Sequence, residues 1–90
     1  MPLLFIGIDP KSEQGDSPTV WVDTDANELL IQGWTASPEE VERCYAEGGT
    51  APGHDNGVPP HETVIRLPAR MAPTIRNALN ALDQPRPADR

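Results

Sequence analysis

The segment SPTVWVDTDANELLIQGW, residues 17–34, constrains the fold of this chain most strongly. Two runs rich in β-branched and aromatic residues, 19–23 and 28–34, flank the turn residues Asp25, Ala26 and Asn27, which predicts a β-hairpin. Asn tolerates the left-handed backbone that such a turn needs. Large apolar residues occur on both faces of both strands, so the hairpin has two faces to cover.

The turn leaves the hairpin register open by one residue. A two-residue turn puts four aliphatic residues on one face, Val20, Val22, Leu29 and Ile31. The opposite face then carries the polar residues Thr19 and Asp23 and the candidate interaction residues Trp21, Leu30, Gln32 and Trp34. A three-residue turn moves Leu30 and Trp34 to the valine face and leaves Trp21 opposite the valines. In both registers each face holds large apolar residues.

The chain has 90 residues, which predicts one small domain of marginal stability. We expect this domain to span residues 1–84 and residues 85–90 to form a flexible tail. The single cysteine, Cys44, excludes an intramolecular disulfide framework, and on the apolar stripe of a helix it is expected to be a buried small hydrophobe. No apolar run approaches the length of a membrane span, so a cytoplasmic protein is expected.

Other patterns predict two more strands and two helices. Residues 3–8 and 62–67 are the strand candidates. Ser37 and Glu40 form a capping box that starts a helix ending at Gly48. A stripe of apolar residues from Met71 to Leu82 predicts a second helix from Pro68 onward. The order β-β-β-α-β-α predicts an α+β fold, a small antiparallel sheet with two helices packed on one face.

Charge is distributed unevenly along the chain. Residues 1–62 hold 12 acids and 2 bases, a net charge of −10, and residues 63–90 hold 2 acids and 5 bases, a net charge of +3. Net acidity argues against direct binding of nucleic acid or an anionic membrane. Arg66, Arg70 and Arg76 lack a nearby aromatic platform for bases. The split favours contacts of these arginines with the acidic half of the same chain or of a second copy, or contacts of the acidic surface with a basic protein partner.

Enzyme signals are weak. His54 and His61 stand seven residues apart in a loop rich in Pro and Gly, a spacing that matches no established metal-ligand pattern, and Glu62 follows His61 directly. No nucleophile, phosphate-loop or dinucleotide motif is present. We therefore expect no cofactor, no metal and no catalysis. A site at His54, His61 and Glu62 is the alternative.

Four segments together resemble a family of short acidic actinobacterial proteins: DP at 9–10, SPTVWVD at 17–23, LLIQGW at 29–34 and PPHETVIRLPARM at 59–71. More loosely, the chain is similar to BldB-type companions of helix-turn-helix regulators. That resemblance implies a non-enzymatic regulatory partner that forms a homodimer and binds a DNA-binding regulator. The matching positions include His61, Glu62 and Arg70, which join the candidate interaction residues.

Two hypotheses account for the second face of the hairpin. In the first, two short helices cover one face of a small sheet and leave the other face exposed for a protein partner. Exposed apolar patches that contain tryptophan are often such interfaces. Alternatively, the N-terminal strand and the long loop fold over it.

Overall fold

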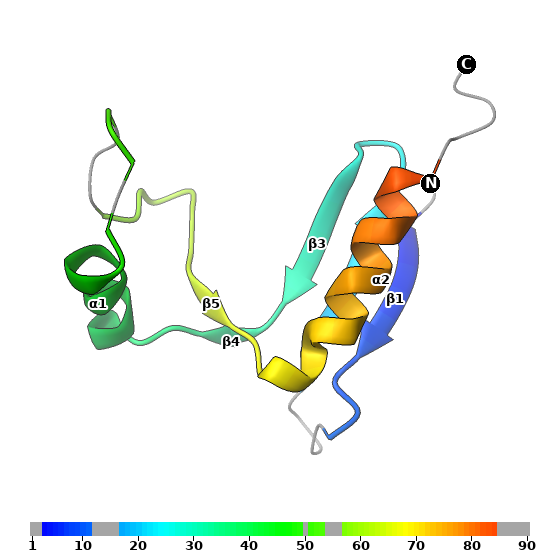
Figure 1. Ribbon diagram of the computed structural model, residues 1–90, viewed down its shortest axis with the longest axis horizontal. Helices are drawn as coiled ribbons and strands as arrows, with labels where there is room; N and C mark the ends of the chain where they lie inside the picture. Colours follow the sequence, from blue (N-terminus) through cyan, green and yellow to red (C-terminus); the bar gives the residue numbers. More distant parts are fainter. Residues whose placement is uncertain (1–2, 12–16, 50, 54–56, 85–90) are drawn as a thin grey trace. The chain divides into compact units, whose positions relative to one another are not determined.

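The chain folds into antiparallel strands and helices (Figure 1). This structure, a computed structural model, describes residues 3–11, 17–49, 51–53 and 57–84. The elements are, in order, β1 (Leu3–Ile8), β2 (Thr19–Asp23), β3 (Glu28–Gln32), β4 (Trp34–Thr35), α1 (Pro38–Glu47), β5 (Ile65–Arg66), the 3₁₀ turn η1 (Ala69–Met71) and α2 (Ala72–Asp83). The predicted α+β class is confirmed.

The chain divides into two compact units. Unit 1 consists of Met1–Gly33 with Leu67–Arg90, and unit 2 consists of Trp34–Arg66. The single domain over residues 1–84 stays a prediction, and the tail at 85–90 lies outside the described residues.

Unit 1 contains a three-stranded antiparallel sheet with the strand order β1-β2-β3. The two valines of β2 pair with Ile31 and Leu29 of β3, which is the first of the two registers that the sequence allowed. β1 pairs along the other edge of β2, and a bulge between Phe5 and Gly7 shifts its register by one residue. The N-terminal strand therefore extends the sheet sideways and does not fold over its second face.

Side-chain hydrogen bonds close the hairpin turn. The carboxylate of Asp23 accepts the backbone N–H groups of Asp25 and Ala26, each at 3.0 Å. Asn27 has the left-handed φ of 64° that the sequence predicted, and its N–H donates to the Asp23 carbonyl at 2.8 Å. The turn thus has four residues between the paired ends of the strands, with a left-handed residue at its last position.

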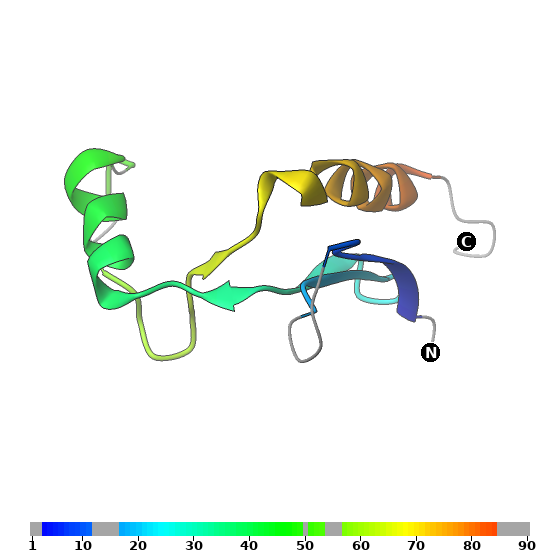
Figure 2. The same cartoon turned by 90° about the horizontal axis from the view of Figure 1, so that it is seen from below.

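Helix α2 lies on one side of this sheet (Figure 2), where it packs mainly on β1 and β2. Its turn at η1 occupies the residues that were predicted to begin the helix, and Pro73 stands in the first turn of α2, where a missing N–H costs no hydrogen bond. Among the described residues the core of the unit centres on Val20, Val22, Met71 and Ala78, all at most 1% exposed.

Unit 2 contains helix α1 and a short ladder of β4 with β5. Trp34 pairs with Arg66 and Thr35 with Ile65. The predicted capping box of α1 is present, because the Ser37 hydroxyl accepts the Glu40 N–H at 3.1 Å and the Glu40 carboxylate accepts the Ser37 N–H at 2.7 Å.

Three details differ from the sequence prediction. The second hairpin strand ends at Gln32, and Gly33 separates it from β4. The strand expected over residues 62–67 is reduced to Ile65–Arg66, and it belongs to a second sheet. Both helices were expected on one face of one sheet, whereas α2 packs on the three-stranded sheet and α1 belongs to unit 2. Two-residue strands are too short for a periodic pattern to define.

Candidate protein-interaction face

The face of the three-stranded sheet opposite α2 carries a row of large apolar side chains. Phe5, Trp21 and Leu30 are direct cross-strand neighbours, one from each strand. Leu3 and Ile8 lie on the same face toward the two ends of β1. We call this surface the outer sheet face, and it consists of Leu3, Phe5, Ile8, Thr19, Trp21, Asp23, Glu28, Leu30 and Gln32.

Exposed apolar side chains are most numerous on the outer sheet face, although Leu4 and Ile31 on the α2 side are 43% and 37% exposed. On the outer sheet face Phe5 is 62% exposed, Leu3 50%, Ile8 44% and Leu30 42%. The valines of β2, which point to the other face under α2, are 0% exposed. Trp21 is half-buried because it occupies the middle of the three-strand row. Contiguous exposed apolar surface of this kind on a small domain is typical of an interaction site.

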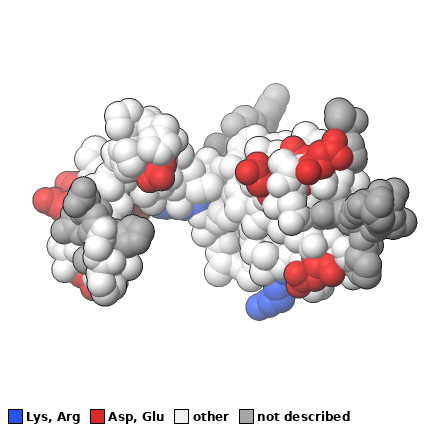
Figure 3. Space-filling view, turned by 90° about the horizontal axis from the view of Figure 1, so that it is seen from above, with Lys and Arg blue, Asp and Glu red and all other residues white. Residues whose placement is uncertain are grey.

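Polar groups border the apolar row at both ends. The Thr19 hydroxyl donates to the Ser17 carbonyl at 2.7 Å, and the Gln32 amide nitrogen donates to the same carbonyl at 2.9 Å. At the other end Asp23 and Glu28 form a cross-strand pair of acids. Acidic surface also predominates over basic surface on the visible side of each unit (Figure 3). A partner that covers the apolar row therefore meets acids at one of its ends.

The remaining candidate interaction residues lie outside the three-stranded sheet. Trp34 lies in β4 of unit 2, with the guanidinium of Arg66 5.4 Å from its ring centroid. Arg66 also contacts the Glu40 carboxylate at 3.2 Å. The hydrogen bond from the Ser37 backbone, more than the Arg66 charge, holds the pKa of Glu40 below its ordinary value. Trp34 is thus part of a local cluster at the base of α1.

His61 and Glu62 are exposed neighbours. The imidazole Nε2 lies 3.6 Å from the Glu62 carboxylate, and the two side chains are 80% and 60% exposed. Both residues lie in a loop, not at the start of a strand as predicted. His54 lies outside the described residues, so its place in the alternative site is not tested.

Arg70 pairs with an acid in the acidic half of its own chain, which is one of the contacts that the charge split favoured, although the sequence did not identify which acid. Its Nε and a terminal nitrogen donate to the two carboxylate oxygens of Asp9, at 2.6 and 2.7 Å. The Asp9 side chain is buried, and it also accepts the Lys11 N–H at 3.0 Å. This bidentate pair joins the end of β1 to η1, and it gives Arg70 a contact within the fold. The Asp-Pro and Pro-x-Arg segments were noted in the sequence, but nothing there linked positions 61 residues apart.

Cys44 is exposed, and the prediction that it is a buried hydrophobe is therefore wrong. Its helix has Val41 and Tyr45 half-buried beside it. Leu3, Phe5 and Ile8 of the outer sheet face were not predicted from the sequence as interaction residues. A prediction that β1 pairs with β2 would have included them. The bulge at the centre of β1, however, interrupts the alternation of its side chains between the two faces of the sheet.

Among the described residues no group of three His, Cys, Asp or Glu side chains is placed to hold a metal ion. None of the described helices has both the length and the apolar character needed to cross a bilayer. Comparison with protein-family models, with curated proteins and with solved structures finds no match.

Proposed function

We propose that this chain is a non-enzymatic protein-interaction module that serves as the companion of a DNA-binding transcriptional regulator, with the outer sheet face as its contact surface. The observation that carries the proposal is the cross-strand row of Phe5, Trp21 and Leu30, which is left open on the face of the sheet opposite α2. Aromatic residues at the centre of an apolar patch are the usual anchors of protein interfaces.

The charge of the chain favours a basic partner. Asp23 and Glu28 border the apolar row, and residues 1–62 carry a net charge of −10. Proteins that bind DNA present basic surfaces, so complementary potentials would speed encounter and orient the complex. The resemblance to companions of helix-turn-helix regulators points to the same partner class.

A matched pair of variants tests the proposal. Leu30→Glu places a charge in the middle of the outer sheet face, and Leu79→Glu makes the same change on α2, at similar exposure of 42% and 47%. The tagged wild-type chain is used to capture partners from its native host, and any captured regulator is purified and titrated against all three proteins. We expect a DNA-binding regulator whose affinity falls at least about tenfold with Leu30→Glu, as for an interface hot spot, and changes little with Leu79→Glu.

Circular dichroism of each variant checks that the fold is retained, and Phe5→Ser, at the most exposed position of the row, serves as a second probe. Capture of proteins that do not bind DNA, or a regulator that binds Leu30→Glu as tightly as the wild type, would contradict the proposal.

A further inference from the structure

The three-stranded sheet has two edge strands, and β3 is one of them. Its five residues pair with β2 in a regular register. Among the residues that the structure describes, no backbone hydrogen bond outside that ladder involves β3. Alternate residues of an edge strand direct their N–H and C=O groups away from the sheet. The outer side of β3 therefore presents backbone donors and acceptors that can pair with a further strand.

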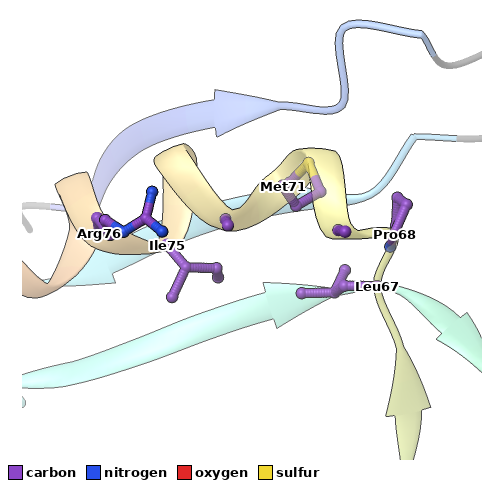
Figure 4. A pocket seen from close by; sticks show the side chains of 7 residues that line it. Leu67, Pro68, Met71, Ile75 and Arg76 are labelled. Atoms are coloured by element: carbon purple, nitrogen blue, oxygen red, sulfur yellow. The ribbon is translucent and has the colours of Figure 1, made fainter.

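The side chains of β3 are open as well. Four of its five residues are exposed, whereas no residue of the central strand β2 is. Helix α2 packs mainly on β1 and β2. At the flank of α2 where Ile75 points toward β3 lies a hollow of about 390 Å³ (Figure 4). The helix thus stops short of the β3 edge.

The two edges of the sheet differ in the features that prevent strand addition. β1 has a bulge between Phe5 and Gly7, and a bulge with a glycine distorts an edge. β3 has no bulge, no proline and no lysine, and its one charged residue is Glu28 at its first position. Edge strands of monomeric proteins usually carry such protection. Of the two edges, β3 is therefore the one suited to strand addition.

The sequence of β3, ELLIQ, is complementary to itself in the antiparallel direction. When two copies pair around Leu30, Leu29 of each copy faces Ile31 of the other. Glu28 then faces Gln32, whose amide has a second N–H besides the one bonded to the Ser17 carbonyl. All five residues are paired, and each acid meets an amide. A parallel neighbour in register would instead set Glu28 beside Glu28, which is destabilising.

We propose that a second copy of this chain occupies this edge: β3 of each copy pairs antiparallel with β3 of the other, and the two three-stranded sheets join in a two-fold symmetric dimer. The axis passes through the pair of Leu30 residues, which become neighbours where the two outer sheet faces meet. This inference goes beyond the interaction proposed above, because backbone groups of an edge make the contact and the outer sheet face stays open.

Two matched lysine substitutions test which edge is used. Ile31→Lys places a charge at the β3 edge, and Leu4→Lys makes the same change at the β1 edge, on the same side of the sheet and at similar exposure of 37% and 43%. Sedimentation should show a wild-type dimer that Leu4→Lys retains and Ile31→Lys dissociates, because lysine at an edge opposes strand pairing. Both changes leave the outer sheet face intact, so binding of a captured regulator is an independent readout.

A cysteine at the two-fold axis tests the register, and it does not depend on the lysine variants folding. In paired antiparallel strands the two Cα atoms of position 30 lie about 4.5–5.5 Å apart, within the range of a disulfide. Leu30→Cys is combined with Cys44→Ser and compared with Phe5→Cys in the same background. Phe5 is more exposed than Leu30, at 62% against 42%. It lies at the opposite edge of the sheet, so the dimer separates its two copies by roughly 24 Å.

We expect the disulfide dimer to form at least about tenfold faster with the thiol at position 30 than at position 5, because strand pairing raises the effective concentration of the two thiols. Equal rates at the two positions, or a wild-type chain that sediments as a monomer, would overturn the proposal. So would a dimer that Leu4→Lys dissociates and Ile31→Lys does not, since the contact would then lie at the β1 edge.

Discussion

Asp9 connects the end of β1 with the residue before β2 and with the turn η1. Its backbone N–H donates to the Pro18 carbonyl at 2.9 Å. Its carboxylate accepts hydrogen bonds from the backbone N–H of Lys11 and from the guanidinium of Arg70. The hydrogen bond from Arg70 outweighs the effect of burial, so the pKa of Asp9 lies below its ordinary value of 3.8. A buried carboxylate with this pairing stabilises the folded state only in its ionised form.

Asp9→Asn should therefore lower the unfolding temperature at pH 7, because the amide keeps the shape but loses the charge paired with Arg70. A lowered folded-state pKa means that the stabilisation is present above pH 3.8 and is lost as pH falls through the folded value. The difference in unfolding temperature between wild type and variant should shrink below pH 3.8. Thermal unfolding at a series of pH values measures it, with the exposed-turn change Asp25→Asn as control. A difference that persists to the lowest pH would refute this account.

At this scale the sequence predicted local roles well and distant pairings poorly. The Ser37 cap and the left-handed Asn27 follow from the chemistry of neighbouring residues, and both are confirmed. Arg70 was assigned to an interaction surface because its position matches the motif of the family that the chain resembles. Its carboxylate partner, Asp9, lies at the far end of the chain, where a single sequence contains no sign of the contact.

Close approach of α2 to the sheet depends on a glycine in β1. A Cβ added at Gly7 would stand 2.9 Å from Thr74 Cγ2, closer than side chains approach without displacement. Gly7→Ala should cost about 1–3 kcal/mol of folding free energy, the usual range for overpacking a well-filled interface.

Thr74→Ala in the same chain removes the obstructing methyl group, so the double variant should recover most of that loss. Denaturant unfolding of the two single variants and the double variant gives the coupling energy. Strictly additive losses would show that this contact does not set the distance between helix and sheet.

Helix α1 depends on its N-terminal cap, since none of its residues is buried. Ser37→Ala removes the acceptor for the Glu40 N–H and should weaken the helix by about 1 kcal/mol, equivalent to roughly fivefold faster amide exchange in its first turns. Ser37→Asp keeps an acceptor and is the matched control. Hydrogen exchange of the α1 amides makes the measurement, and equal exchange in the Ala and Asp variants would argue against a role for the cap.

On the scale of the whole molecule, the sequence predicted helices packed on one face of a small sheet, and in unit 1 helix α2 lies on one face of the three-stranded sheet. The division into two units was not predictable. A single glycine such as Gly33 within a strand-like segment can mark a bulge as well as the end of a strand, and strands as short as Trp34–Thr35 have no periodicity of their own. The outer sheet face was inferred from the hairpin alone, and the first strand, taken there as a possible cover, enlarges it instead.

A core centred on four residues, Val20, Val22, Met71 and Ala78, gives a small unit limited stability of its own. If copies of this chain associate, folding and association are linked, and the unfolding temperature should rise with protein concentration. Each tenfold increase in concentration stabilises a dimer by about 1.4 kcal/mol. If the copies associate through the outer sheet face, Leu30→Glu should remove this dependence, because it places a charge in the middle of that face, whereas Leu79→Glu, at similar exposure on α2, should retain it. Thermal unfolding over a wide concentration range, followed by circular dichroism, makes the measurement. An unfolding temperature of the wild type that is independent of concentration would mean that copies of this chain do not associate through this face.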